Sequence, residues 1–187
     1  MADPRILADL PSGDALAEGF TELRANTLVA LGERANAVVT VTSPHAEEPR
    51  RHVAAHLAAA LAQTGRRVLL VDADVDGTGG DAGPEERVVP PQLSVVTAEA
   101  VRADDPALLS GTASRAWLRG EAERHDLVVV AAPPLLDVPD GRALAARADG
   151  VLLTVVHART NRDDSIRARA ILREAGANLL GAVVVEG

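Results

Sequence analysis

The feature that most limits the fold of this chain is a set of short segments that are apolar at consecutive positions. LVVVA (127–131) and VLLTVV (151–156) show almost no alternation of apolar and polar side chains. Strands of this kind are buried on both faces, which occurs in a parallel sheet with helices on both sides. The sequence therefore predicts an α/β fold with three layers and a mostly parallel sheet.

Apolar periodicity divides the chain into alternating strands and helices. The expected strands are 37–42, 67–72, 93–97, 126–131, 150–156 and 179–185, and the expected helices are 14–31, 50–64, 112–124, 139–147 and 162–175. We interpret residues 1–187 as one domain, with a flexible segment at 1–13 and a long loop at 73–91. Ligands of such sheets bind at the carboxyl ends of the strands, so the loops there are expected to define the site.

Composition excludes several classes of function. The net charge is −8, which argues against nucleic acid as a partner. The chain has no cysteine, so it has neither disulfides nor thiolate metal sites. No apolar run approaches the roughly 18 residues of a membrane helix, so we expect a soluble chain, or a soluble piece of a longer membrane protein.

Residues 38–57 have the layout of a strand, a phosphate loop and a helix, but not the usual residues of such a loop. A P-loop uses glycines for its turn, a lysine for the phosphates and a Ser or Thr hydroxyl for magnesium. There is no glycine between Gly32 and Gly65, and all 19 basic side chains of the chain are arginines. Pro49 has no N–H to offer a phosphate.

The order of segments resembles the bacterial tyrosine kinases (BY-kinases) of capsule and exopolysaccharide export, relatives of the ParA/MinD-type P-loop ATPases. The resemblance covers roughly residues 14–186 and implies a P-loop NTPase-like fold. It rests on AEGFTELRANTLVAL (17–31), VTVTSP (39–44), AAHLAAALAQTGRRVLLVDAD (54–74), HDLVVVAAPPLLDVPDG (125–141) and the closing segment 148–185.

The resemblance also places the residues of a vestigial nucleotide site. After Ser43, the family's glycines fall on His45, Glu47 and Pro49, its lysine on Arg50, its magnesium-binding hydroxyl on Arg51, and the next Ser/Thr-type position on His52. The Walker A′ acids remain as Asp72 and Asp74, whereas Ala131 stands near the expected Walker B carboxylate. The family's tyrosine cluster is absent, because the chain has no tyrosine.

These departures lead us to expect a pseudoenzyme with no catalytic residues, no cofactor and no metal. Such a pseudokinase would have a structural or regulatory role in surface-polysaccharide synthesis and export. The resemblance implies a cytoplasmic module at the inner face of the plasma membrane, held there by a partner or by a missing transmembrane region. The implied partners are a membrane-spanning polysaccharide co-polymerase or chain-length regulator, a paralogous BY-kinase, or further copies of the chain.

Two alternatives remain open. The first is an active ATP-dependent tyrosine kinase or ATPase with an altered loop, in which Arg50 binds phosphate and Asp72 and Asp74 hold Mg²⁺. The second is a nucleotide- or anion-sensing module in which Arg50 and Arg51 bind the ligand without turnover.

Other residues have both a functional and an ordinary interpretation. Glu18 and Arg24 overlay a family motif used in ring assembly, so they mark either an oligomer interface or an ordinary exposed helix face. His52 and His56 have the i,i+4 spacing of a metal pair, but without a third ligand we expect packing histidines. The run Asp72, Asp74 and Asp76 is either a remnant cation site or a solvated strand end. Ser43, His45 and Asp72 contain the residue types of a hydrolase triad, without a nucleophile elbow to support one.

Overall fold

The computed structural model describes residues 6–10 (backbone only), 16–32, 34–46, 49–73, 90–97, 100 and 113–186. The strands are β1 (Ile6–Leu10), β2 (Ala37–Thr42), β3 (Val68–Asp72), β4 (Leu93–Thr97), β5 (Leu127–Ala131), β6 (Gly150–Val156) and β7 (Leu179–Val185). The helices are α1 (Leu16–Leu31), α2 (Arg50–Ala62), α4 (Ala113–Arg124), α5 (Pro139–Ala145) and α6 (Arg162–Glu174).

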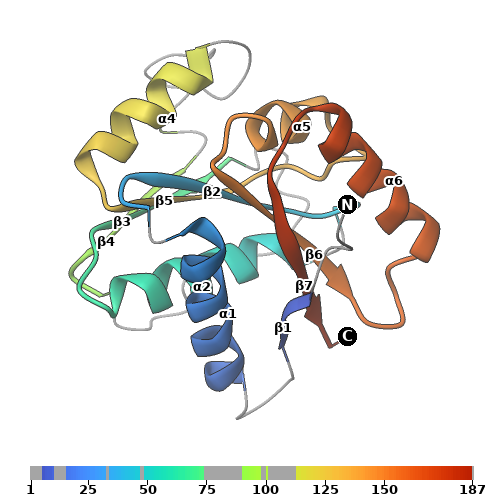
Figure 1. Ribbon diagram of the computed structural model, residues 1–187, viewed down its shortest axis with the longest axis horizontal. Helices are drawn as coiled ribbons and strands as arrows, with labels where there is room; N and C mark the ends of the chain where they lie inside the picture. The colour runs from blue at the N-terminus through green and yellow to red at the C-terminus, as the bar shows by residue number, and fades with distance from the viewer. Residues whose placement is uncertain are drawn as a thin grey trace.

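The seven strands form one sheet in the order β1-β7-β6-β2-β5-β3-β4, and every strand pair within the described residues is parallel. Helices α1 and α2 cover one face of the sheet, and α4, α5 and α6 cover the other (Figure 1). The predicted three-layer α/β class with a mostly parallel sheet is therefore confirmed.

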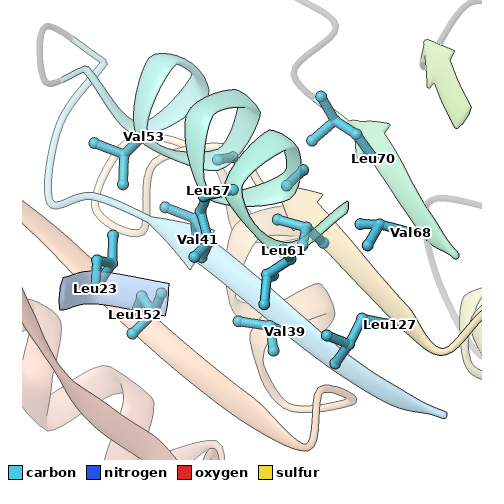
Figure 2. Packing of buried hydrophobic residues seen from close by; sticks show 14 of the residues in the cluster. Leu23, Val39, Val41, Val53, Leu57, Leu61, Val68, Leu70, Leu127 and Leu152 are labelled. Atoms are coloured by element: carbon cyan, nitrogen blue, oxygen red, sulfur yellow. The ribbon is translucent and has the colours of Figure 1, made fainter. Parts of the chain in front are cut away.

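The largest apolar cluster lies between the sheet and the pair α1 and α2. Figure 2 shows Val53, Leu57 and Leu61 of α2 directed at Val39 and Val41 of β2. Adjacent residues of β2 are buried on opposite faces, because Val39 belongs to this cluster and Val38 to the cluster under α4. Burial on both faces explains why Val38 and Val39, at consecutive positions of this strand, are both apolar.

The expected elements agree with the observed ones to within about two residues at most ends, which is the usual uncertainty of an element boundary. The expectation of a flexible segment at 1–13 does not hold for residues 6–10. These residues form β1, which pairs with β7 from Ile6 opposite Ala182 to Leu10 opposite Val185. The local sequence did not predict β1, because the edge of β7 that it pairs with is remote in the chain.

The crossover connections that follow the neighbouring strands β2 and β5 run in opposite directions along the sheet. From β2 the chain passes through α2 on one face to β3, whereas from β5 it passes through α5 on the other face to β6, beyond β2. The chain therefore leaves β2 and β5 at the same carboxyl edge but continues to helices on opposite faces of the sheet. In open α/β sheets such a switch point is where ligands bind.

Among the described residues, no helix combines the length and the apolar character needed to cross a membrane.

Candidate functional site

The loop after β2 is attached to the loop after β5 by backbone hydrogen bonds. Leu135 N–H donates to the Ser43 carbonyl at 2.8 Å, and Leu136 N–H donates to the Pro44 carbonyl at 3.0 Å. The Thr42 hydroxyl donates to the Pro133 carbonyl at 2.9 Å. Two of the predicted site-forming loops therefore lie side by side at the carboxyl edge of the sheet.

Arg50, which we predicted to stand at the position of the P-loop lysine, is completely buried. Its Nε donates to the Ala132 carbonyl at 3.0 Å, and its Nη1 donates to the Ala46 carbonyl at 2.9 Å. A buried cation is costly unless its donors are satisfied, and these carbonyls provide part of that satisfaction. The guanidinium thus connects the loop after β2 to the loop after β5.

Arg51 turns toward β3 and pairs with Asp72, the last residue of that strand. Its Nε lies 3.2 Å from Oδ1 and 3.0 Å from Oδ2 of Asp72, and its Nη2 also contacts Oδ2. The two side chains are only 19% and 17% exposed. This pair links the first turn of α2 to the carboxyl end of β3.

The described residues do not fit a magnesium ion held in the manner of a P-loop. A guanidinium has only donors, so Arg51 cannot supply the oxygen ligand that a Ser or Thr provides at this position. Both carboxylate oxygens of Asp72 already accept hydrogen bonds from Arg51. The alternative in which Asp72 holds Mg²⁺ therefore requires this ion pair to open.

His45 lies between two carboxylates that the sequence analysis did not identify. Its Nδ1 is 2.8 Å from Asp137 Oδ1, and its Nε2 is 3.5 Å from Asp164 Oδ2. The backbone N–H of Ala46 donates to the other oxygen of Asp137 at 3.0 Å. The hydrogen bond to Asp137 raises the pKa of His45, and the charges of both carboxylates add to it, against a smaller opposing effect of burial.

The available signal for these two acids was indirect. Asp137 follows the Pro133-Pro134 stop of β5, in a loop that was expected to face the site. Asp164 lies in the first turn of α6, where an acid is common for local reasons. Neither belongs to a recognisable motif, so only the three-dimensional structure brings them to His45.

The remaining predicted site residues have local roles. Ser43 is buried, and its hydroxyl donates to the His45 carbonyl at 2.6 Å. Pro49 is the N-cap of α2 and makes no side-chain capping bond. Ala131 is buried at the end of β5. Glu47, Asp74 and Asp76 lie outside the described residues.

His52 and His56 pack against each other, with ring centroids 4.1 Å apart, and His56 stacks on Phe20 of α1 at 4.9 Å. This is the packing arrangement that we expected. Within the described ranges, no group of three or more side chains of the metal-ligating types is close enough to hold an ion.

Glu18 and Arg24 differ in their surroundings. Glu18 is exposed, whereas Arg24 is half-buried and its Nη1 donates to the Ala60 carbonyl of α2 at 3.4 Å. Arg24 therefore has an internal role in joining α1 to α2. An oligomer interface formed by these residues stays a prediction.

Known proteins resemble the chain over nearly its whole length. The tyrosine-protein kinase YwqD of Bacillus subtilis is 27% identical over 188 aligned residues, covering 89% of this chain and 79% of that protein. The putative tyrosine-protein kinase EpsB of Ralstonia nicotianae is 28% identical, and the match covers 95% of this chain but only 26% of that protein. This chain is similar in sequence to the bacterial tyrosine kinases.

Solved structures agree at the level of the fold. The kinase domain of the Escherichia coli tyrosine kinase ETK has a TM-score of 0.81 at 21% identity, covering 98% of this chain and 90% of that domain. A MinD cell-division ATPase from Pyrococcus furiosus is a more distant match. No protein-family model matches the chain. The predicted resemblance to BY-kinases and to MinD-type proteins is confirmed.

The expectation of a pseudoenzyme is wrong, because relatives aligned over 89–97% of the chain are named tyrosine-protein kinases and point to an enzyme. The sequence argument treated a lysine and a hydroxyl as indispensable. The alternative that we left open, an active enzyme in which Arg50 binds phosphate, is the one that these relatives favour.

Proposed function

We propose that the chain is an ATP-dependent protein-tyrosine kinase or ATPase that works through an altered phosphate loop. The observation that carries this proposal is the similarity to named tyrosine-protein kinases over nearly the whole chain, YwqD included. The position of Arg50 and Arg51 at the carboxyl edge of β2 is consistent with it, because ligands of parallel sheets bind at this edge. Arginine also binds phosphate through geometrically fixed donors.

The 187 residues contain no tyrosine. A kinase built from this chain must therefore phosphorylate a tyrosine that belongs to another polypeptide segment. We propose a role in the synthesis and export of surface polysaccharide, in the cytoplasm beside the membrane, with a membrane-spanning co-polymerase as partner. Support for that setting comes from the family resemblance alone, and the match spans only about a quarter of the length of relatives such as EpsB.

The decisive experiment measures phosphate release from labelled ATP and its transfer to a synthetic Glu-Tyr polymer. We expect turnover by the unaltered chain and its loss in Asp72→Ala, because that substitution releases Arg51 from its position. Arg67→Ala is a matched control, since Arg67 is 61% exposed and pairs with Asp126 at the opposite edge of the sheet. Turnover no higher than that of Asp72→Ala would refute the enzymatic proposal, and binding without turnover would favour the sensing module.

A further inference from the structure

The carboxylate of Asp137 occupies two hydrogen-bond donors of the loop after β2. Its Oδ2 accepts from the Ala46 backbone N–H at 3.0 Å, and its Oδ1 lies 2.8 Å from His45 Nδ1. Both oxygens of one carboxylate thus contact two successive residues of the loop. A backbone N–H beside a cationic ring is a donor pair that suits an anion, and here the anion is a side chain of the same protein.

Contacts that do not involve Asp137 hold these donors in place. The Ser43 hydroxyl donates to the His45 carbonyl at 2.6 Å, and this carbonyl belongs to the same peptide group as the Ala46 N–H. The buried Arg50 donates to the Ala46 carbonyl at 2.9 Å. Removal of the Asp137 carboxylate would therefore leave the donors preorganised for another anion.

Asp164, in the first turn of α6, faces the opposite nitrogen of the His45 ring. Its Oδ2 lies 3.5 Å from His45 Nε2. A carboxylate at each nitrogen favours the protonated ring, because only the imidazolium has two N–H donors. Arg167 lies 3.5 Å from Asp164 in turn, so the group of His45, Asp164 and Arg167 has a net positive charge when Asp137 turns away.

The Asp137 side chain can leave the donors without a movement of the main chain. It is 37% exposed, so rotation about its side-chain bonds turns the carboxylate into solvent. The adjoining backbone is fixed separately, by the hydrogen bonds that Leu135 and Leu136 donate to the loop after β2. A partly exposed ion pair contributes little to stability, so an anion with more charge and more oxygens can displace this carboxylate.

We propose that the Ala46 N–H and the His45 ring form a phosphate subsite, and that Asp137 occupies this subsite until a nucleotide polyphosphate displaces it. This inference rests on the proposed function, in which ATP binds at the carboxyl edge of β2. It makes Asp137 an internal competitor of the ligand. Its carboxylate weakens phosphate binding by occupying the donors and by repelling a like charge.

The test is calorimetric titration of the unaltered protein and of Asp137→Ala with inorganic tripolyphosphate and with ATP. Loss of the competing carboxylate is expected to tighten the binding of both ligands by about fivefold or more. Asp140→Ala is a matched control, because Asp140 lies three residues further along, in the first turn of α5. This control removes the same charge without freeing the donors, so its affinities are expected to stay within about twofold of the unaltered protein.

Two further measurements identify the donors. Addition of His45→Ala to the Asp137→Ala variant is expected to reverse most of the gain in affinity, because it removes one of the two donors. Circular dichroism checks that each variant is folded. In the unaltered protein, the amide NMR signal of Ala46 is expected to shift during titration with tripolyphosphate, and a signal that does not move at saturation would overturn the inference.

The outcomes separate this inference from the enzymatic proposal. Equal or weaker binding by Asp137→Ala, or equal tightening by Asp140→Ala, would overturn the inference, and phosphate transfer by the unaltered protein would still support the enzymatic proposal. Tighter binding by Asp137→Ala alone, without phosphate transfer by the unaltered protein, would support the inference and overturn the enzymatic proposal. No binding of either ligand to any of these proteins would overturn both.

Discussion

The two ends of the sheet use arginine and aspartate in different ways. At the amino end, Asp149 accepts from the Val38 N–H at 2.8 Å and from Arg119, whose side chain is 46% exposed. Asp126 accepts in the same manner from the backbone and the exposed side chain of Arg67. At the carboxyl end the cations face inward instead, and Arg50 is completely buried.

This contrast distinguishes charges at the beginnings of strands from charges at the edge of the sheet where we propose that a ligand binds. At the amino end, each carboxylate accepts hydrogen bonds from both a backbone N–H and an arginine, which fixes where a strand begins. At the carboxyl end, the arginines stand where we predicted, from the family resemblance, the lysine and the hydroxyl residue of a P-loop. Arginine and aspartate therefore have a structural role at the amino end. At the carboxyl end, we propose that they also take part in ligand binding.

The largest expected effect is that of Arg50→Ala. The substitution leaves a cavity and removes the donor from the buried Ala132 carbonyl, so we expect a loss of about 2–4 kcal/mol in the free energy of unfolding. Arg119→Ala, at the other end, is expected to cost less than about 1 kcal/mol, because the ion pair between Arg119 and Asp149 is partly exposed. Urea denaturation of both variants measures the difference. Similar losses in the two would mean that Arg50 has no special structural role.

Glycine substitutions compare the two ends by packing rather than by charge. A Cβ added to Gly141 would lie 2.3 Å from the Pro133 carbonyl oxygen, a backbone atom of the loop after β5. We expect Gly141→Ala to cost about 2–3 kcal/mol.

At Gly150, on the amino end, the added Cβ would meet the Leu180 side chain at 2.4 Å. This side chain can rotate away, so Gly150→Ala is expected to cost about 1 kcal/mol. Thermal unfolding of the two variants tests the order, and a larger loss for Gly150→Ala would contradict it.

Asp149→Asn tests the amino end by pH. Burial alone would raise the pKa of Asp149, but hydrogen bonds from Arg119 and Val38 outweigh it and lower the pKa below its ordinary value. The stabilisation is thus present above the unfolded pKa, near 4, and is lost as the pH falls through the lower folded value. We expect a loss of about 1–2 kcal/mol for Asp149→Asn at neutral pH. The loss should shrink in acid, and a loss that does not change with pH would contradict this assignment.

The smallest effect is expected for His45→Gln, at the carboxyl end. The pKa of His45 is raised, so its stabilisation is fully present below about pH 6.5 and is lost as the pH rises through the higher folded value. Because His45 is 39% exposed, we expect His45→Gln to lower the free energy of unfolding by less than about 0.5 kcal/mol. NMR titration of the ring measures the pKa directly, and an unshifted value in the unaltered protein would show that the contact with Asp137 does not form in solution.

The fold was predictable because its information is local. Strands such as 127–131 are apolar at every position, and this pattern specifies burial on both faces without knowledge of the neighbouring strands. Strand β1 was missed, because Ile6–Leu10 becomes a strand only through pairing with β7. The candidate site was placed by the rule that ligands bind at the carboxyl ends of parallel strands, and its position stays a prediction.

The contacts within the site were not predictable. The sequence places Arg50 and Arg51 next to each other, but not the inward turn of one and the pairing of the other with Asp72. The direction of each side chain depends on which carbonyls and carboxylates the neighbouring loops present. Asp137 was missed for the same reason, since its role depends on the loop after β5 lying beside His45.

The parallel pair of β1 and β7 has a consequence for how the protein is made. Leu10 and its partner Val185 lie near opposite ends of the sequence. At a synthesis rate of 5–20 residues per second, β1 leaves the ribosome roughly ten to thirty seconds before β7 exists. During that interval β1 has no neighbour on the sheet, so its pairing is among the last events of folding.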